Sequence, residues 1–581
     1  MKTEPILSFE FSHSDGKIIP YTFQNPHRVI TAYTIEEVEP CLRLVEDAVE
    51  QGFYAAGFLS YESAPAFDPA YMVHKGNKLP LLWFGIFQEP DHLPLNSSGT
   101  YTLSEWKPSI EIEEYNAAID SIKQSIEDGV TYQINYTIRL TSQFQGDEMA
   151  FFENLKRGQT SNYCAYLHAG DHSILSASPE LFFHLKGDKI VTRPMKGTVK
   201  RGKTLNEDIT NANWLYHSEK NRAENVMIVD LLRNDLGMIA EPGTVEVESL
   251  FDIEQYPTVH QMTSTISAQV SEQVTIFDVF KALFPCGSIT GAPKVSTMNI
   301  IAELETAPRE VYCGAIGFIT PQKEAVFNVP IRTVIIDQHS GEATYGVGGG
   351  VTWDSTAEGE YQEILAKAKL LSENRPPFQL LESILLENGT YFLLAEHLKR
   401  LEDSAQYFGF IYKKGNVEES LQQFAMQNQL GCYKVRLLLS RDGSLIMEGQ
   451  SIMPMDEPLQ VMVAKHPIDK NSPFLYHKTT NRMIYSDFQQ NKPKDVFDVL
   501  LWNESGELTE FTNGNIVIEM DGQYWTPPVE SGLLAGTYRN RLIKSGKIHE
   551  KILTKADLKK CTRVCFINSV RKWIDVQVQE H

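Results

Sequence analysis

The chain has 581 residues, 42% of them hydrophobic, and a formal net charge of −22. This length predicts several domains with ordinary globular cores, and the acidic charge argues against a nucleic-acid-binding protein. No signal-peptide core and no apolar run of about 18 residues is visible, which predicts a cytoplasmic protein that does not enter a membrane. The seven cysteines form no CxxC pair, so we expect reduced core thiols rather than a metal site.

The first 100 residues alternate strand and turn patterns, with one helix predicted near 35–51. An amphipathic helix is predicted over about 112–129. Much later, the sequence Glu-Asn-Arg-Pro-Pro at 373–377 interrupts the pattern, and a new strand pattern begins after it. These signals predict two domains, residues 1–373 and 378–581, joined by a linker at 374–377.

A hairpin is predicted around the sequence Lys-Gly-Asp-Lys at 186–189, between two strand-like runs. A turn centred on Gly187-Asp188 sets Glu180 opposite Met195, one position from Lys196. Side chains of neighbouring strands have Cβ atoms about 5 Å apart. The register therefore predicts that a carboxylate and an amine meet at one end of the hairpin, although an exposed ion pair is the alternative interpretation.

Two helices with acidic residues follow. The first is predicted over 218–237, with Gly237 as its stop. The second covers 358–367 and places Glu360, Glu363 and Lys367 on one face by i,i+3 and i,i+4 spacing. A solvated helix face is the alternative interpretation of that spacing.

Two glycine-rich segments are predicted as loops. The sequence CGSITGAPK at 286–294 leads into a helix, with Pro293 near its first position. The sequence YGVGGG at 345–350 would expose backbone N–H groups where a carboxylate could dock. Each segment alone is weak evidence for a binding site.

Taken in this order, these motifs resemble the chorismate-utilising enzymes, the family of anthranilate synthase component I, over about residues 100–372. Members that add a small nucleophile at chorismate C2 generally have alanine where this sequence has Lys196. Members that make 4-amino-4-deoxychorismate have lysine there, as in TRPMKGT at 192–198. The resemblance implies a fold of large antiparallel sheets with helices, and amination of chorismate.

The resemblance also implies roles for individual residues. Lys196 would attack C2 as a neutral amine while Glu180 protonates the departing 4-hydroxyl, and ammonia would then displace the lysine at C4. Glu224 and Glu363 match the ligands of Mg²⁺, with Glu360 close by. The implied chorismate-binding positions are His260, Thr290, Tyr312, Arg332, Gly348, Gly349 and Lys367.

The second half resembles the fold-type IV pyridoxal-phosphate enzymes over about residues 378–580. The motifs are EHLKRLEDSA at 396–405, HKTTNR at 477–482, GELTEFTNGNI at 506–516 and GLLAGTYR at 532–539. This family includes branched-chain and D-amino acid transaminases and aminodeoxychorismate lyase. The complete fold class is therefore expected to be α/β and α+β in two domains, the second of them similar to D-amino acid aminotransferase.

In that family Lys478 matches the lysine that binds pyridoxal phosphate covalently. Glu510 matches the carboxylate beside the pyridine nitrogen, and Arg400 the phosphate-binding arginine. Asn515, Gly536, Thr537 and Tyr538 complete the implied cofactor site, with backbone N–H groups at a helix start holding the phosphate. Tyr538 stands where the transaminase pattern has threonine, so a side-chain hydroxyl contact with the phosphate is not expected.

Together the resemblances imply a bifunctional enzyme that aminates chorismate and then eliminates pyruvate to give 4-aminobenzoate, a folate precursor. No nucleophilic cysteine in a Gly-x-Cys-x-Gly turn is visible, which implies ammonia from solution or from a separate glutamine amidotransferase subunit. A homodimer through the pyridoxal-phosphate domain is a further expectation. Two alternatives remain open: an anthranilate- or isochorismate-type synthase fused to a transaminase, and a synthase carrying a non-catalytic scaffold domain.

Overall fold

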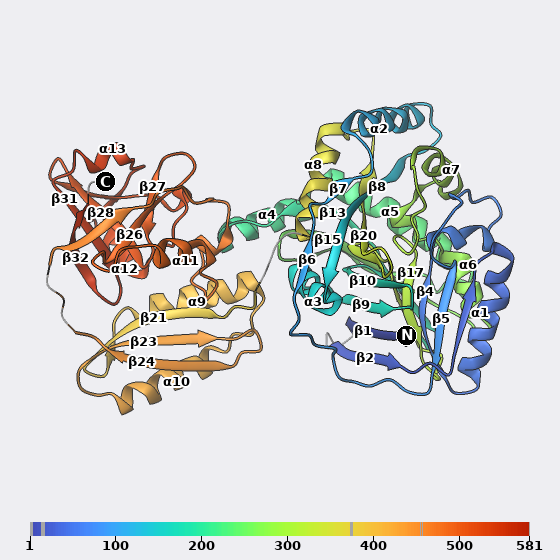
Figure 1. The fold of residues 1–581 in the computed structure, drawn as a ribbon, viewed down its shortest axis with the longest axis horizontal. Helices are drawn as coiled ribbons and strands as arrows, with labels where there is room; N and C mark the ends of the chain where they lie inside the picture. Colours follow the sequence, from blue (N-terminus) through green and yellow to red (C-terminus); the bar gives the residue numbers. More distant parts are fainter. Residues whose placement is uncertain (1–3, 13–17, 372–375, 454, 456, 580–581) are drawn as a thin grey trace. The chain divides into compact units, whose positions relative to one another are not determined.

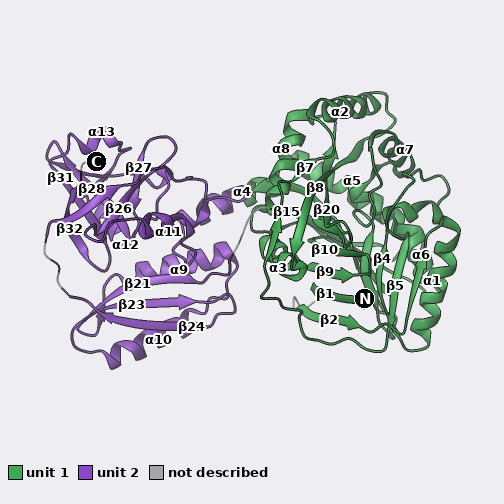
Figure 2. Cartoon of the chain, in the orientation of Figure 1, with its two compact units in different colours: residues 1–200, 212–375 green, residues 201–211, 376–581 purple. Residues whose placement is uncertain are grey.

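The structure is a computed structural model that describes residues 4–12, 18–371, 376–453, 455 and 457–579. The chain divides into two compact units (Figure 2). Unit 1 comprises residues 1–200 and 212–375, and unit 2 comprises residues 201–211 and 376–581. The predicted linker at 374–377 falls partly outside the described residues, so the predicted domain limits stay predictions. The sequence did not indicate that 201–211 belongs with the second unit.

Unit 1 contains two 10-stranded sheets in which neighbouring strands are antiparallel. The first has the order β16 (Gly291–Ala292), β8 (Gln133–Gly146), β20 (Glu342–Val351), β19 (Thr333–Asp337), β10 (His172–Ser178), β9 (Tyr163–His168), β1 (Ile6–Ser12), β2 (Ile18–Gln24), with β6 (Tyr101–Leu103) and β7 (Lys107–Pro108) on β8. The second has the order β13 (Met195–Lys200), β15 (Val259–Gln269), β12 (Lys189–Arg193), β11 (Leu181–Lys186), β18 (Ala325–Asn328), β17 (Ala315–Ile319), β4 (Tyr54–Leu59), β5 (Leu82–Phe87), β3 (Arg28–Ala32), with β14 (Glu246–Gln255) on β15.

Helices cover the outer faces of both sheets (Figure 1). Side chains of α1 (Ile35–Glu50), α5 (Glu219–Gly237) and α6 (Ile276–Leu283) pack on the second sheet. Those of α2 (Ile112–Glu127), α3 (Glu148–Gln159) and α8 (Ala357–Ala368) pack on the first. The helix α7 (Lys294–Leu304) lies against β8 and β16 of the first sheet and contributes Met298 to the core of the second. A third core, which includes Phe9, Phe58 and Ile316, lies between the sheets. The alternation of inward and outward side chains along each strand makes this layered packing possible.

The predicted helices near 35–51, 112–129, 218–237 and 358–367 are confirmed as α1, α2, α5 and α8. The helix predicted after the 286–294 segment is α7, whose N-cap is Pro293. The prediction of a loop at 345–350 is wrong, because these residues lie within β20 and pair with β8 along their length. Glycine has a low propensity for β-strands. Here the packing of these residues against α8 and Lys196 outweighs that low propensity.

The hairpin of β11 and β12 is confirmed at its turn, where Lys186 faces Lys189. Further along, a β-bulge shifts the register so that Leu181 faces Arg193. The predicted pairing of Glu180 with Met195 is therefore wrong as a strand register. A bulge adds one residue to one strand, and periodicity alone does not reveal it.

Unit 2 contains a 4-stranded sheet and an 8-stranded sheet. The 4-stranded sheet has the order β22 (Thr390–Tyr391), β21 (Leu380–Glu387), β23 (Cys432–Leu439), β24 (Leu445–Ser451) and packs against α9 (Leu394–Phe408) and α10 (Lys414–Gln427). The 8-stranded sheet has the order β27 (Leu508–Phe511), β26 (Asp498–Trp502), β25 (Leu459–Val463), β32 (Lys572–Val578), β31 (Arg563–Asn568), β28 (Gly514–Met520), β29 (Gln523–Thr526), β30 (His549–Glu550). Because β27 also pairs with β28, six of these strands close into a barrel around a core that includes Leu500 and Phe566.

The remaining elements connect these layers. They are α4 (Leu205–His217), α11 (Met483–Gln490), α12 (Thr537–Lys544), α13 (Lys555–Leu558) and the 3₁₀ helices η1 (Tyr61–Ala66), η2 (Gly287–Ile289), η3 (Lys369–Leu371), η4 (Pro473–Leu475) and η5 (Val529–Ser531). No helix among the described residues is long and apolar enough to cross a membrane. Two domains with mixed sheets and helices confirm the expected fold class.

Candidate active sites

Lys196 lies on a β-bulge of β13, where the pairing with β15 slips by one residue. Gly197 follows with a φ of 93°, a conformation that glycine adopts without strain. The carbonyl of Lys196 accepts a hydrogen bond from Nδ2 of Asn225 at 3.4 Å, and that of Gly197 accepts one from Nε2 of Gln261 at 2.9 Å. These side chains, from α5 and β15, take the place of the interrupted ladder and hold the backbone of the lysine.

Glu180 is buried in the connection between β10 and β11. Its Oε1 accepts a hydrogen bond from Oγ of Ser288 at 2.6 Å, and the backbone amide of Met195 also donates to its carboxyl group. The carboxyl group therefore reaches the residue before Lys196, although the strand register differs from the prediction. Burial raises the pKa of Glu180 to about 7, while Ser288 and the charge of Lys196 oppose the rise.

The amine of Lys196 lies beside Gly350 of β20. A Cβ at position 350 would lie 2.7 Å from Nζ of Lys196 and 1.9 Å from Nε2 of Gln133, so glycine lets both side chains approach the strand here. Removal from water lowers the pKa of Lys196, whereas the carboxylates of Glu224 and Glu180 act in the opposite direction. A lowered pKa increases the neutral fraction of an amine, which is its nucleophilic form.

The acidic face of α8 covers the glycine-rich part of β20, next to Lys196. Lys367 pairs with Oε1 of Glu363 at 2.7 Å and donates to the carbonyl of Gly348, also at 2.7 Å. Oε1 of Glu360 accepts from Ser355 at 2.7 Å. A Cβ on Gly349 would come within 2.8 Å of Oε2 of Glu360. This face is therefore not simply solvated, and the glycines let the helix approach the strand.

The candidate Mg²⁺ ligands face the same lysine from two helices. Glu224 of α5 and Glu363 of α8 each interact electrostatically with Lys196. Hard carboxylate oxygens are the donors that Mg²⁺ prefers, so the donor set fits this ion. Within the described parts of the chain, however, no three His, Cys, Asp or Glu side chains are gathered closely enough to form a metal site. The ligand assignment remains a prediction.

The other predicted chorismate-binding residues are spread more widely. Arg332 has a φ of 53°, donates to Gln159 and interacts electrostatically with Glu180. His260 is buried on β15, opposite Val199 of β13.

Thr290 and Tyr312, two of the predicted chorismate-binding residues, contact the two glycine-rich segments. The hydroxyl of Thr290 donates to the carbonyls of Cys286 and Gly287, at 3.1 and 3.3 Å. The ring of Tyr312 lies against Gly346 and under the guanidinium of Arg139. Their contact with chorismate therefore stays a prediction. Gln133, Asn225, Gln261, Ser288 and Gly350 were not predicted, since each reaches Lys196 or Glu180 only through tertiary packing.

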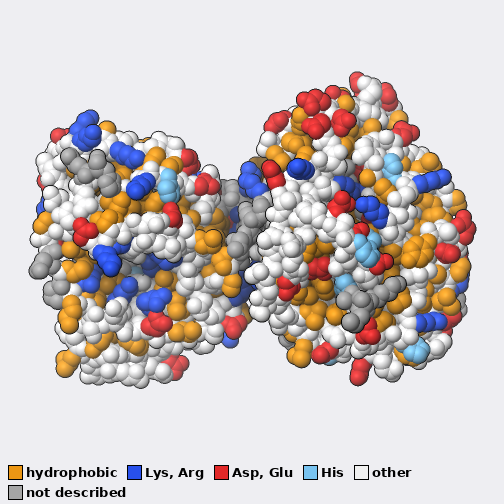
Figure 3. All heavy atoms as spheres, in the orientation of Figure 1, with side chains coloured by type: hydrophobic (Ala, Val, Ile, Leu, Met, Phe, Trp, Pro, Cys, Tyr) orange, Lys and Arg blue, Asp and Glu red, His pale blue; other side chains and the backbone are white. Residues whose placement is uncertain are grey.

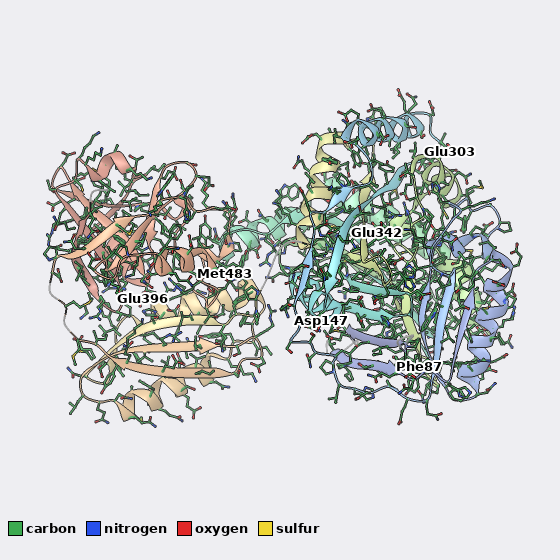
Figure 4. The ribbon with its side chains drawn as sticks, viewed as in Figure 1. Phe87, Asp147, Glu303, Glu342, Glu396 and Met483 are labelled. Atoms are coloured by element: carbon green, nitrogen blue, oxygen red, sulfur yellow. The ribbon has the colours of Figure 1, made fainter. Side chains whose placement is uncertain are left out.

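In unit 2, Lys478 lies between η4 and α11, two elements beside α9 (Glu396 and Met483 in Figure 4 mark α9 and α11). Its carbonyl accepts a hydrogen bond from the amide of Leu381 at 3.0 Å, which ties the segment to β21. Burial, together with the cations Arg400 and Arg482, lowers the pKa of Lys478 to about 7. An amine with this pKa can both form covalent bonds and exchange protons near neutral pH.

Glu510 projects from β27 into the same site and is buried. Its Oε1 accepts from the hydroxyl of Tyr485 at 2.9 Å, and its Oε2 accepts from the amide of Leu534 at 3.2 Å and from Nδ2 of Asn515 at 3.3 Å. Burial raises the pKa of Glu510 to about 8. Asn515 also donates to the carbonyl of Leu534 at 2.9 Å, so it supports Glu510 and the adjacent loop.

Arg400 of α9 is held by a buried carboxylate. Its Nε and Nη2 donate to the two oxygens of Glu382 at 2.8 and 2.7 Å. Nδ1 of His397 lies 2.6 Å from Oε2 of Glu382, and its Nε2 lies 3.3 Å from Oγ1 of Thr537. Burial alone would raise the pKa of Glu382, but Arg400 and His397 hold it at about 2. A continuous network therefore joins the arginine to the start of α12.

The residues at this helix start fit a phosphate group. A Cβ on Gly536 would lie 2.1 Å from Oδ1 of Asn515, so the backbone passes closely there. The amides of α12, the hydroxyl of Thr537 and the guanidinium of Arg400 supply positive potential and donors. Tyr538 points its ring toward Phe392, in agreement with a backbone-only role. Lysine and arginine side chains gather on the face of unit 2 where α9, α12 and β21 meet (Figure 3).

Unit 1 thus combines a helix-flanked pair of large antiparallel sheets with a half-buried lysine near the carboxylates of Glu180 and Glu224. The profile of the chorismate binding enzyme family matches residues 9–373, and the chain belongs to this family. The profile of the amino-transferase class IV family matches residues 379–578.

Named relatives match the first half. Aminodeoxychorismate synthase component 1 of Salmonella typhimurium (strain LT2) is 41% identical over 264 residues, 45% of this chain and 58% of that protein. The Bacillus subtilis (strain 168) protein of the same name is 41% identical over 254 residues, 44% of this chain and 54% of that protein. This chain therefore spans only part of the length of these relatives. Anthranilate synthase component I of Streptococcus pneumoniae TIGR4 shares the fold, with a TM-score of 0.52 and 24% identity over 64% of this chain and 91% of that one.

Proposed function

We propose that the chain makes 4-aminobenzoate from chorismate in two steps, an amination in unit 1 and a pyruvate elimination in unit 2. The observation that carries the proposal is Lys196, whose amine lies beside a glycine strand, with a lowered pKa, near Glu180 and the acidic face of α8. The relatives named aminodeoxychorismate synthase support the first step, and the match of unit 2 to the class IV amino-transferases supports the second.

In the first step the neutral amine of Lys196 forms a bond to C2 of chorismate. The ring double bonds shift, the C4–O bond breaks, and Glu180 gives its proton to the departing hydroxyl, which leaves as water. Ammonia then bonds to C4, the double bonds shift back, and the bond between C2 and Lys196 breaks. The product is 4-amino-4-deoxychorismate. The pKa of Glu180, about 7, keeps a large fraction of this group protonated at neutral pH.

Mg²⁺ would be held by Glu224 and Glu363, with Glu360 close by. When bound, the ion would neutralise and orient the substrate's carboxylate. Lys367 already pairs with Glu363 and with the carbonyl of Gly348. It can therefore donate to a substrate carboxylate when Glu363 turns toward a metal ion. Arg332 would contribute a second positive charge near Glu180.

Pyridoxal phosphate would be held by Lys478, Arg400, Glu510 and the amides at the start of α12. When bound, the cofactor would supply an electron sink for removal of a proton from carbon. Lys478 would take the proton from C4 of the intermediate and return a proton to the departing enolpyruvate. Glu510 would face the pyridine nitrogen and share its proton. Formation of an aromatic ring would make the elimination favourable.

The ammonia would come from solution or from a separate glutamine amidotransferase subunit. A direct test is to incubate the purified chain with chorismate, Mg²⁺, ammonium and pyridoxal phosphate and to identify the aromatic product. We expect 4-aminobenzoate and pyruvate. Anthranilate or isochorismate as the main product would contradict the proposal and favour a synthase of the other type.

The second site is tested by Lys478→Ala in the full chain. We expect 4-amino-4-deoxychorismate to accumulate while 4-aminobenzoate formation stops, because the site loses both its covalent anchor and its base. Undiminished 4-aminobenzoate formation by this variant would mean that unit 2 is a scaffold.

A further inference from the structure

Unit 2 contains a segment from the first half of the sequence, Arg201–Asn211 (purple in Figure 2). The segment follows β13 directly and runs into α4. Asp208 holds its start in place, because its carboxylate accepts from Nε and Nη2 of Arg201 at 2.6 and 2.8 Å and from the amide of Gly202 at 2.9 Å. Residues 201–204 therefore form a loop that is held by charged hydrogen bonds, and residues 205–211 are the first part of α4.

This loop packs on Tyr407 near the end of α9. The guanidinium carbon of Arg201 lies 4.4 Å from the centre of the Tyr407 ring, and its Nη2 donates to the Tyr407 carbonyl at 2.6 Å. The hydroxyl of Tyr407 donates to the carbonyl of Gly202 at 2.7 Å. Ring, hydroxyl and backbone of one residue are thus all engaged by two residues of the loop.

The ring of Tyr407 in turn fixes the residue before Lys478. The imidazole of His477 stacks on it, with ring centres 4.1 Å apart and an interplanar angle of 26°. Nδ1 of His477 lies 3.0 Å from Oγ of Ser404, also on α9. On the other side, the carbonyl of Lys478 accepts from the amide of Leu381. The peptide that carries Lys478 is therefore clamped between α9 and β21.

We propose that Arg201 is a positioning residue for Lys478, acting through the Arg201–Tyr407–His477 stack. Without the guanidinium, Tyr407 loses a charged contact and a hydrogen bond. Its ring can then rotate, and His477 loses the ring on which it stacks. Lys478 would then sample orientations in which its amine points away from the cofactor. This inference rests on the proposed pyridoxal-phosphate function of unit 2, and it makes part of the first half of the sequence necessary to that function.

The test uses the full chain with Arg201→Gln, titrated with pyridoxal phosphate and followed by the absorbance of the bound cofactor. We expect the dissociation constant to rise about tenfold, since a desolvated cation–π contact and a charged hydrogen bond are lost together. Hydrogen exchange of the cofactor-free chain should be faster at 474–482, with chorismate consumption retained. Arg233→Gln is the matched control. Arg233 lies on the exposed face of α5, where it pairs with Asp230, and no stacking of its guanidinium on a ring is seen among the described residues.

Three further variants keep the test decisive if Arg201→Gln unfolds. Arg201→Lys retains the charge opposite Asp208 but loses the flat face, and should show the same defect more mildly. Tyr407→Phe keeps the stack and should bind the cofactor nearly as the unaltered chain does, whereas Tyr407→Leu should not. If all Arg201 and Tyr407 variants matched the unaltered chain in cofactor affinity and in hydrogen exchange, this inference would be overturned, whereas the proposed function of unit 2 would stand. Failure of the unaltered chain to bind pyridoxal phosphate would overturn the proposed function of unit 2 and this inference with it.

Discussion

Both oxygens of the buried Glu382 side chain accept hydrogen bonds from Arg400, at 2.8 Å from Nε and 2.7 Å from Nη2. This fork holds the guanidinium in one orientation before any phosphate arrives. Preorganisation of this kind reduces the entropy lost on binding.

Glu382→Gln should therefore weaken the binding of pyridoxal phosphate by about 10- to 100-fold, the factor for losing one charged hydrogen bond of roughly 1.5–3 kcal/mol. Because the pKa of Glu382 is held at about 2, below its ordinary value near 4.3, the ion pair stabilises unit 2 above about pH 4.3. That contribution is lost as pH falls through about 2. The melting temperatures of the unaltered chain and of Glu382→Gln should therefore converge at acid pH. Glu402→Gln, on the exposed side of α9, is the control and should change neither quantity.

Lys196→Ala should abolish normal formation of 4-amino-4-deoxychorismate, because no covalent bond to C2 can form. Water or ammonia would then reach C2, so we expect small amounts of C2-substituted products in chromatograms of the reaction. Lys189→Ala, on the same hairpin and paired with exposed Glu248, should leave the product pattern unchanged. A Lys196→Ala enzyme with undiminished activity would refute the role of nucleophile.

The pH profile of the first step should contain a limb near pH 7 that belongs to Glu180. This group must be protonated to act as an acid, and its pKa is raised to about 7 by burial. The amine of Lys196 must be neutral, so its lowered pKa sets the other limb. Ser288→Ala removes a hydrogen bond that favours the charged carboxylate, so the Glu180 limb should move to higher pH. Ser288→Thr keeps a hydroxyl and should retain the original profile. An unchanged limb in Ser288→Ala would show that another group sets it.

Gly349→Ala should impair the first step about tenfold or more and leave the lyase step intact. The new methyl group would come within 2.8 Å of Oε2 of Glu360 and displace this carboxylate from its position beside the candidate metal ligands. Overpacking of this kind typically costs about 1–3 kcal/mol. Gly237→Ala is the matched control, since a Cβ there meets nothing within 4 Å. Chorismate consumption and pyruvate release from supplied intermediate, measured separately, distinguish the two steps.

The sequence predicted the elements whose signals are local. The helices now seen as α1, α2, α5 and α8 carry apolar periodicity and end signals in consecutive residues, and the hairpin turn at Gly187 has its own turn chemistry. The motif order around Lys196 and Lys478 predicted both families. Short-range spacing is sufficient for such features because the chain's own geometry places residues three or four apart on one helix face.

Tertiary structure alone decided the rest. The glycine-rich sequence at 345–350 predicted a loop, yet these residues form a strand because β8 and α8 pack against them from distant parts of the sequence. The bulges beside Glu180 and Lys196, the hydrogen bond from Ser288 and the stacking of Arg201 on Tyr407 join residues up to 206 positions apart. No periodic pattern encodes such pairs. They follow from which surfaces bury together, and burial in turn shifts the pKa values of Glu180, Lys196 and Lys478 away from those of the free side chains.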